Sequence, residues 1–381
     1  MAETRLQAVR RHLGYKADDV IKMLLRRADA LAVPVMSATS LKTKLSRWEN
    51  GKEAVSQPYR RLFRDVYGRT SEELGFPQEE ANDEADELIS RLAQARSVDA
   101  ETVEVFKRQV EQARHVDRRF GGVALLDQLR SNIEQLQGFL GFSTTNGQRQ
   151  ALAGVLTEAS ALAGWEALDR NAIRQAWEHH ETAKAAAREA GSPILLAHST
   201  AQQAFILIDL GEVQAAVDQL AEARALAERT APPVLRAWMA AAHGEGLAAA
   251  NQRDDALRAF DAAGTHLPAD PVDPALPFLF LGGAHLDRWR GNALSKLGEP
   301  DAIQQLTAAL PLLPPDFIRA KTGMLVDLAF AYAAAGDRDA SLDHARQARR
   351  LASQIKSDRQ LRRLSGLILP GSAADAVRFA S

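Results

Sequence analysis

A degenerate repeat of about forty residues, which begins near Ala151, is the feature that most constrains how this chain can fold. Its five expected turns between paired helices, at Leu168, Gly211, Asn251, Gly298 and Gly336, are 43, 40, 47 and 38 residues apart. Small side chains lie seven residues before the turns: Ala161, Ala204, Gly244, Gly291 and Ala329. Bulky side chains follow the first four turns by about nine residues: Trp177, Leu220, Phe260 and Leu306. A small residue lets the two helices of a hairpin approach closely, so the pattern predicts stacked helix hairpins.

Prolines and the scarcity of strand patterns favour an all-α fold. In the repeat region the prolines fall between the expected helices, at Pro193, Pro232, Pro233, Pro268 to Pro277 and Pro311 to Pro315. They interrupt no helical hydrogen bonds there. Few β-branched residues alternate with polar ones. We therefore predict an all-α chain whose C-terminal part is an α-solenoid of helix pairs, with an Ala-rich bundle without repeats as the alternative.

The repeat resembles the tetratricopeptide pattern, although its period exceeds that family's roughly 34 residues and the consensus tryptophan is missing. In that family stacked helix pairs curve, and the first helix of each pair lines the hollow. The resemblance implies that seven residues face such a groove: His198, Phe205, Trp238, Glu245, His285, Arg288 and Asn292. A groove with this mixture would bind a peptide or small ligand, through apolar surface and a few polar groups. The alternative is that each residue packs against its neighbouring repeat.

A second helical pattern occupies the N-terminal region and centres on Ser40 to Lys52. Leu41, Leu45 and Trp48 are spaced to share one face of a helix, and polar or basic residues occupy the rest. Asn50-Gly51 is predicted to end this helix, because both residues tolerate the left-handed conformation. Four further helices are predicted over residues 5–13, 18–32, 57–67 and, opened by a capping box that begins at Thr70, 71–74.

Five short helices, together with the sequence RWENGK, resemble the helix-turn-helix domain of Xre-type transcriptional regulators, especially actinobacterial ones. The resemblance implies that the helix from Ser40 is a recognition helix, which lies in the major groove of DNA. The residues implied to contact base edges or the groove margin are Lys42, Thr43, Lys44, Ser46 and Arg47, and those implied to bind phosphates are Lys52, Arg60 and Arg61.

Two stretches depart from that family's pattern. Residues 15–18 (YKAD) stand where the family has a Ser/Thr cap followed by a phosphate-binding Gln, so Lys16 is the candidate replacement. The segment AVPVMSATS before the recognition helix is longer than the family's tight turn. We predict that Val33, Val35 and Met36 pack inward and hold the angle between the two helices.

Charge and composition divide the chain into three expected parts. These are a helix-turn-helix domain in residues 1–77, a linker and helical connector in residues 78–150, and the repeat domain in residues 151–381. Helices are predicted over residues 84–96, 99–119 and 123–140 of the connector. Residues 1–77 carry a net charge of +6 and the remainder −8. Such an asymmetry is expected when only one domain meets a polyanion.

The sequence carries no motif for catalysis, so we predict that the protein is not an enzyme and has neither a cofactor nor a metal. Cysteine, a phosphate-binding glycine loop, HExxH and GxSxG are all missing. His179 and His180 are adjacent on a helix, so they point apart and are expected to be surface or packing residues. No signal-peptide pattern and no apolar run of membrane-spanning length is present, which indicates a cytoplasmic protein without a membrane partner.

These expectations describe a sequence-specific DNA-binding transcriptional regulator. Its partners would be double-stranded DNA and a second copy of the chain in a homodimer on two half-sites. By analogy with peptide-responsive regulators, a peptide or small-molecule effector would bind in the repeat groove, and a constitutive regulator without an effector is the alternative. The alternative is a protein-interaction scaffold that uses its repeats, with the N-terminal domain as a docking module.

Overall fold

The computed structural model describes residues 4–31, 33–77, 80–122, 126–282 and 284–371. Within these ranges every regular element is a helix and no strand is present, which confirms the predicted all-α class. The chain divides into two compact units, Met1–Ser90 and Arg91–Ser381. The helix α6 (Glu80–Arg96) includes the point of division. It begins within the stretch that was predicted to be a linker.

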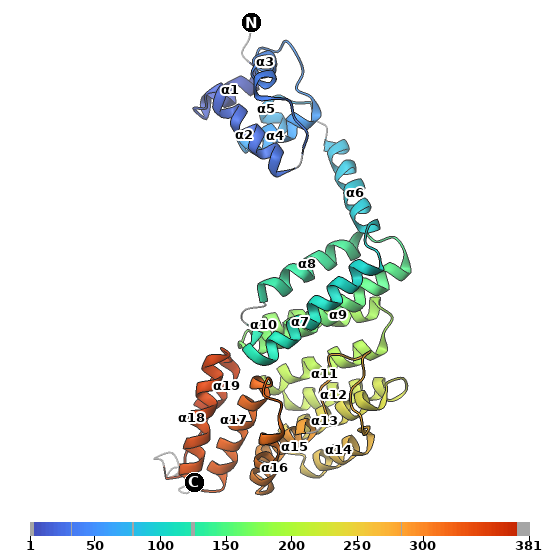
Figure 1. Cartoon of the computed structure of the whole chain (residues 1–381), viewed down its shortest axis with the longest axis vertical. Coiled ribbons are helices and arrows are strands. Elements are labelled where there is room, and N and C mark those ends of the chain that lie inside the picture. Colours follow the sequence, from blue (N-terminus) through green and yellow to red (C-terminus); the bar gives the residue numbers. More distant parts are fainter. Residues whose placement is uncertain (1–3, 32, 78–79, 123–125, 283, 372–381) are drawn as a thin grey trace. The chain divides into compact units, whose positions relative to one another are not determined.

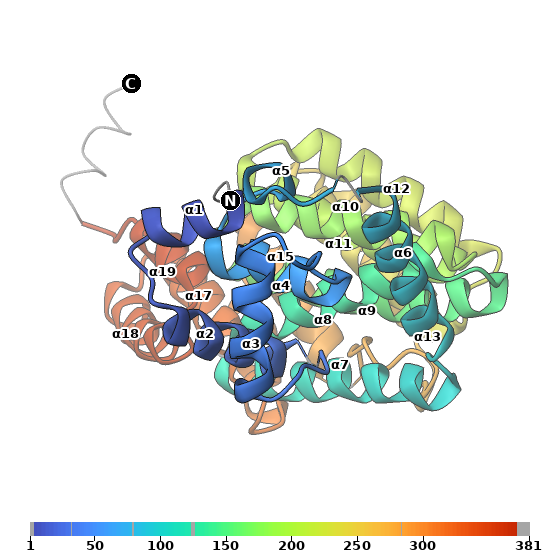
Figure 2. The same cartoon turned by 90° about the horizontal axis from the view of Figure 1, so that it is seen from above.

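The first unit gathers five helices around one apolar core (Figures 1 and 2). Leu24, Leu41, Leu62 and Phe63 are fully buried in this core. The predicted capping box is present at the start of the last helix, where Thr70 Oγ1 accepts from the Glu73 amide and the Glu73 carboxylate accepts from the Thr70 amide. The five helices are α1 (Arg5–His12), α2 (Ala17–Ala30), α3 (Ala38–Glu49), α4 (Gln57–Tyr67) and α5 (Ser71–Leu74).

The ends of α3 show how the expected recognition helix is held. The segment before it packs inward as predicted, with Val33, Val35 and Met36 partly buried against the core. The Met36 amide donates to the Tyr59 hydroxyl at 2.7 Å. At the other end α3 stops at Asn50-Gly51 as predicted, with Gly51 in the left-handed conformation at φ of +66° and Asn50 at φ of −96°. The Asn50 side-chain amide instead donates to the Ser46 carbonyl at 2.6 Å, so only glycine takes the left-handed backbone.

The second unit consists of helices that pack side by side in chain order, as hairpins stacked on one another (Figure 1). Helices α7 and α8, from the expected connector, pack on α9 within this unit. Gly121 ends α7, close to the end predicted at residue 119. Residues 123–125 of the next predicted helix lie outside the described residues. The helices of the unit after α6 are α7 (Ala100–Phe120), α8 (Leu126–Phe142), α9 (Asn146–Asp169), α10 (Ile173–Glu189), α11 (Pro193–Leu210), α12 (Val213–Glu228), α13 (Pro233–Ala249), α14 (Arg253–His266), α15 (Ala284–Leu297), α16 (Asp301–Ala309), the 3-10 helix η2 (Leu310–Leu312), α17 (Ile318–Ala334), α18 (Arg338–Gln354) and α19 (Asp358–Ser365).

Left-handed residues mark the turn inside each of five hairpins, from α9/α10 to α17/α18. Four of the five predicted turns lie at these positions, but Leu168 lies inside α9 and the turn is three residues further on. Asn171 takes the left-handed conformation there because an asparagine tolerates it at a helix end. The left-handed turn residues are Asn171, Gly211, Asn251, Gly298 and Gly336.

Moving the first turn from Leu168 to Asn171 shows why a small residue recurs in the first helix of each hairpin. Seven residues before Asn171 is Gly164, where an added Cβ would lie 2.7 Å from Nε2 of His180. The same substitution at Gly244 would place a Cβ 2.8 Å from the ring of Phe260. These distances are too short for a real Cβ, so glycine permits the close approach of the two helices. His180 is therefore a buried packing residue, equivalent in position to Phe260.

The array also closes on itself, because its last helices return to its first. Helix α17 packs on α7, and α19 packs on α9. Arg319 on α17 forms an ion pair with Asp117 on α7, which is 202 residues away in the sequence. The Ser357 hydroxyl donates to Asp169 at 2.6 Å across a separation of 188 residues. Because of this closure, the first and the last helices of the array line the same hollow.

None of the helices in the described ranges combines the length and the apolar character that crossing a bilayer requires.

Candidate functional site

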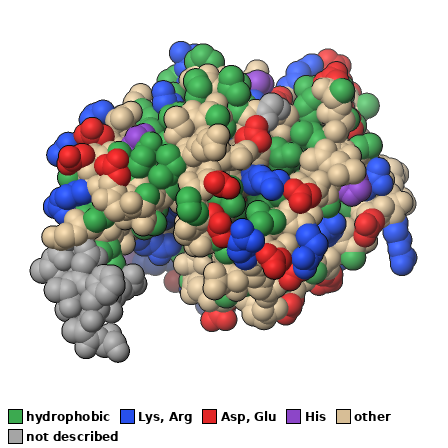
Figure 3. Space-filling view, turned by 90° about the horizontal axis from the view of Figure 1, so that it is seen from below, with side chains coloured by type: hydrophobic (Ala, Val, Ile, Leu, Met, Phe, Trp, Pro, Cys, Tyr) green, Lys and Arg blue, Asp and Glu red, His purple; other side chains and the backbone are tan. Residues whose placement is uncertain are grey.

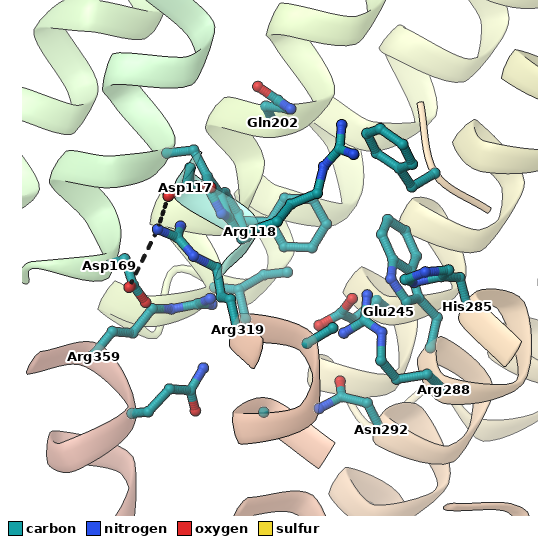
Figure 4. Close-up of a pocket in the computed structure, with 18 of the residues that line it drawn as sticks. Asp117, Arg118, Asp169, Gln202, Glu245, His285, Arg288, Asn292, Arg319 and Arg359 are labelled. Carbon is teal, nitrogen blue, oxygen red and sulfur yellow. Dashed lines mark hydrogen bonds and ion pairs between the residues drawn. The ribbon is translucent and has the colours of Figure 1, made fainter. Parts of the chain in front are cut away.

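A cavity of about 690 Å³ lies inside the closed array (Figure 4). Its described lining comes from α7, α9, α11, α13, α15, α17 and α19, together with the segment that carries Phe278 and Phe280. None of the described lining residues lies on α8, α10, α12, α14, α16 or α18. One helix of each hairpin therefore faces the cavity, and the other covers it from outside.

All seven residues expected to face a groove line this cavity. Helix α15 carries three of them, and α11 and α13 carry two each. The structure thus brings the seven together, while their role in binding stays a prediction. The seven lining residues are His198, Phe205, Trp238, Glu245, His285, Arg288 and Asn292.

The same repeat positions identify further lining residues that the sequence projection left out. Glu158 and Trp165 lie thirteen and six residues before the turn residue Asn171, and both line the cavity. Gly323 and Phe330 hold the equivalent positions in α17 and line it too. The first pair was missed because its turn was placed at Leu168. The lining residues on α7 and α19 reach the cavity because the array closes, and no position in the repeat predicts that closure.

One wall of the cavity is aromatic. The His198 ring centroid lies 4.3 Å from that of Phe278 and 4.9 Å from that of Trp238. The centroids of Trp238 and Trp289 are 5.5 Å apart, with the rings nearly edge to face. Burial, reinforced by the charge of Arg114, lowers the pKa of His198 to about 3, so this ring is neutral at physiological pH.

Ion pairs hold most of the charged lining in place. Arg319 lies between Asp117 and Asp169, as the dashed lines of Figure 4 show. Arg359 donates two hydrogen bonds, of 2.5 and 2.9 Å, to the carboxylate of Asp209. Burial opposes ionisation of Asp209, but Arg359 outweighs it and keeps the pKa of that carboxyl below its usual range. These paired groups join α17 to α7 and α9, and α19 to α11.

Further polar contacts link α13, α15, α17 and α19. Asp327 accepts from the Asn292 side-chain amide at 2.8 Å and from Arg363 at 2.6 Å. Lys296 donates to the Glu245 carboxylate at 3.1 Å. Glu245 and Asp327 therefore already have cationic partners within the protein.

Two arginines of the lining have no close carboxylate partner, although the Glu111 carboxylate lies 3.9 Å from Arg118. The Arg118 guanidinium lies 3.5 Å from the ring centroid of Phe280, and burial lowers the pKa of this arginine. The Nε of Arg288 is buried and has no hydrogen-bond partner in the described part of the chain. In the same part, no carboxylate lies within 4.0 Å of the Arg288 guanidinium. His285 lies near both arginines, and burial followed by their charges lowers its pKa to about 3.

A buried carboxyl group lies beside the closure of the array. Glu166 on α9 is fully buried, and neither of its oxygens has a hydrogen-bond partner among the described residues. Burial, followed by the charge of Asp117, raises the pKa of Glu166 to about 9. An added Cβ at Gly122 would lie 2.5 Å from the Cγ of Glu166, so glycine leaves room for this side chain. In the described ranges, no cluster of three or more histidine, aspartate or glutamate side chains is arranged to hold a metal ion.

Helix α3 presents two different sides. Its apolar residues Leu41, Leu45 and Trp48 are buried in the core of the first unit. Glu49, also buried, accepts from Arg10 on α1 at 2.6 and 2.8 Å and so fixes the end of the helix. Five residues of α3 are expected to contact DNA. Lys44 is half-buried, and the other four are exposed: Lys42, Thr43, Ser46 and Arg47.

Acidic residues accompany these basic groups. Asp18 forms an ion pair with Lys42 at 2.9 Å, and both side chains are largely exposed. Glu53 forms an ion pair with Lys44 and lies 3.6 Å from the guanidinium of Arg47. The DNA-facing surface expected from the sequence is therefore partly neutralised in the free protein.

The three expected phosphate-binding residues differ in exposure. Lys52 and Arg61 are exposed to solvent. Arg60 is half-buried, and its Nε donates to the Val55 carbonyl at 2.6 Å. Arg60 therefore supports the turn after α3 in this structure.

Other surfaces of the chain carry mixed charge. On the face drawn in Figure 3, basic and acidic side chains alternate among hydrophobic ones. Opposite charges interspersed in this way give a weaker field for a polyanion than a surface of one sign.

No family model and no curated protein matches the chain. Among solved structures, the chain is similar to the crystal structure of nearly identical TPR-like repeats of a kinesin light chain from Podosopora anserina, with 15% sequence identity and a TM-score of 0.34. The match covers 52% of this chain and 95% of that one. A TM-score of this size does not establish a shared fold, so the hairpin architecture rests on the helices of this chain alone.

Proposed function

We propose that this chain is a sequence-specific DNA-binding transcriptional regulator, in which α3 reads the major groove. The observation that carries the proposal is the two-sided character of α3. Its apolar side is buried in a small helical domain, whereas basic and hydroxyl side chains on its other side are exposed. Such a helix offers the hydrogen-bond donors and acceptors that reading base edges requires. The net charge of +6 on residues 1–77 supports the same proposal.

Individual residues have distinct roles in this proposal. Arg47, whose side chain is 58% exposed, would donate two hydrogen bonds to O6 and N7 of a guanine, a contact that discriminates by about 1–3 kcal/mol. Lys52 and Arg61 would bind phosphates and position the helix without selecting a sequence. A single domain of this size offers little interface, so we propose a homodimer on two half-sites.

The second unit supplies the regulatory part of the proposal. A cavity of about 690 Å³ with aromatic and charged walls is within the range of small-molecule sites. A ligand bound there would alter DNA binding if it prefers one of two arrangements of the chain, because an effector shifts an equilibrium only through such a difference.

The decisive experiment is a selection of random-sequence duplex DNA by the purified protein at moderate salt. We expect an enriched motif with wild type and with the control Arg26→Ala, which removes an exposed arginine from α2. We expect no enriched motif with Arg47→Ala. The spacing of the two halves of the motif would give the geometry of the dimer.

Salt dependence separates base reading from phosphate binding. Lys52→Ala is expected to weaken binding to all sequences and to reduce the slope of log affinity against log salt by about one. If neither Arg47→Ala nor Lys52→Ala changes DNA binding, the proposal is wrong. The repeats would then be the part of the chain to examine, as a scaffold for a protein partner.

A further inference from the structure

The cavity of the second unit has chemical features that restrict its ligand more narrowly than its volume does. Its described lining carries eight lysines and arginines against six aspartates and glutamates. Four of the carboxylates, those of Asp117, Asp169, Asp209 and Asp327, already bind arginines of the protein. Glu158 pairs with Arg114, Glu245 pairs with Lys296, and Glu111 lies 3.9 Å from Arg118. In the described chain, Arg288 and Arg362 are therefore the lining cations without a carboxylate within 4.0 Å.

Arg288 is the clearest of these groups. It lies on α15, lines the cavity, and has a buried Nε without a hydrogen-bond partner among the described residues. Glu245 is the acidic side chain whose charge acts on it most strongly, but that carboxylate accepts from Lys296 at 3.1 Å. A buried donor without a partner is costly, and an anionic ligand group would satisfy it.

Two more groups converge on the same part of the cavity. Arg118, from α7, lies flat against Phe280, with its guanidinium 5.4 Å from the ring centroid of Phe317. The side-chain oxygen of Asn292 is buried without a partner in the described chain, and Figure 4 labels Asn292 beside Arg288. The subsite thus offers guanidinium donors and one amide acceptor, set among aromatic rings.

A cationic ligand and an extended peptide both fit this arrangement less well. Aromatic rings attract cations, but here Arg118 already lies over Phe280, and the positive excess repels a further cation. An extended peptide needs an open groove, whereas contacts of α17 with α7 and of α19 with α9 close the array. The helices therefore surround the cavity as a ring, and its volume of about 690 Å³ suits a compact molecule.

We propose that this cavity binds a compact acid with an aromatic or apolar body, whose anionic group is held by Arg288 and Arg118. The body would pack against Trp238 and Trp289, which are buried in the wall, and a polar substituent would donate to Asn292. The proposal names the ligand class of the pocket in the proposed function. It does not depend on DNA binding by the first unit.

A matched pair of fluorescent probes tests the proposal. 1-Anilinonaphthalene-8-sulfonate and N-phenyl-1-naphthylamine share an aromatic body, and only the first carries an anionic group. Both are titrated into the full chain and into the variants Arg288→Gln and Arg258→Gln. Arg258 is an exposed arginine on α14 outside the cavity and serves as the control.

We expect Arg288→Gln to raise the dissociation constant of the sulfonate probe by about tenfold or more, because a hydrogen bond to a charged group is lost. The same variant should change that of the uncharged probe by less than about twofold, and Arg258→Gln should change neither. An unchanged affinity for the sulfonate probe, or an equal loss for both probes, would overturn the proposal. Failure of wild type to bind either probe would also overturn it.

A second variant locates the probes without altering charge. At Gly323 an added Cβ would have only Nε2 of Gln360 within 4 Å, at 3.9 Å, so a larger side chain can enter the cavity from α17. Gly323→Leu should therefore weaken binding of both probes while thermal unfolding shows the helices intact. Unchanged binding of both probes would place them elsewhere and contradict the proposal. Loss of DNA binding in the selection experiment has no bearing on these titrations, so the two proposals fail separately.

Discussion

Replacement of Gly121 by alanine tests whether closure of the array stabilises the second unit. Gly121 ends α7 with φ of 77° and ψ of 166°. Residues other than glycine rarely adopt this region of backbone space, and the strain for alanine is about 1–3 kcal/mol. The added Cβ would also lie 2.3 Å from the carbonyl oxygen of Ile355, at the turn between α18 and α19. A backbone atom cannot turn away as a side chain can.

The expected magnitude follows from these two effects. Overpacking against a fixed neighbour costs about 1–3 kcal/mol. Alanine also restricts the unfolded chain, which offsets about 0.4–1 kcal/mol of the loss. We therefore expect Gly121→Ala to lower the free energy of unfolding by about 1–5 kcal/mol, or roughly 2 °C in melting temperature for each kcal/mol in a unit of this size.

The assay is urea unfolding of the full chain followed by far-ultraviolet circular dichroism. Gly138→Ala is the matched control, because Gly138 lies within α8 and an added Cβ there meets nothing within 4 Å. This control should stabilise the chain by about 0.5–1 kcal/mol through helix propensity. If Gly121→Ala is as stable as wild type while the control behaves as expected, the contact between α7 and Ile355 does not hold the array closed and the reasoning is wrong.

Two further substitutions test buried and surface charge. Burial, followed by the charge of Asp117, raises the pKa of Glu166 in the folded chain to about 9. The folded state therefore binds more protons than the unfolded state between about pH 4.5 and 9, and the free energy of unfolding falls as pH rises through this range. Glu166→Gln should flatten that fall when urea unfolding is compared at about pH 6 and pH 8.5, and an equal fall in both proteins would contradict the assigned cause. Glu53→Gln should free Lys44 and Arg47 to contact DNA and raise the affinity for DNA by up to about fivefold in an equilibrium binding titration. An unchanged or lower affinity for DNA would count against the proposal that the exposed side of α3 binds DNA.

Local sequence signals predicted much of the fold because their causes are local. The capping box at Thr70 needs only four consecutive residues, and the structure has it. The small residue before each turn is equally local, since Gly244 and Gly291 each contact the following helix of their own hairpin. The turn predicted at Leu168 was placed wrongly, because the left-handed residue is Asn171 and no glycine nearby marks that position in the sequence.

The amino-acid pattern alone was enough to predict that the helices stack in hairpins. It also predicted that His198, Trp238 and His285 hold equivalent positions in successive repeats, because both features follow from helical period and turn spacing. Closure of the array, which places Arg319 beside Asp117 across 202 residues, is visible in the folded chain alone. The lack of an acidic partner for Arg288 among the described residues is visible there too. Closure and the surroundings of Arg288 depend on the rotation of each hairpin relative to the next. This rotation accumulates along the array and cannot be read from the local sequence pattern.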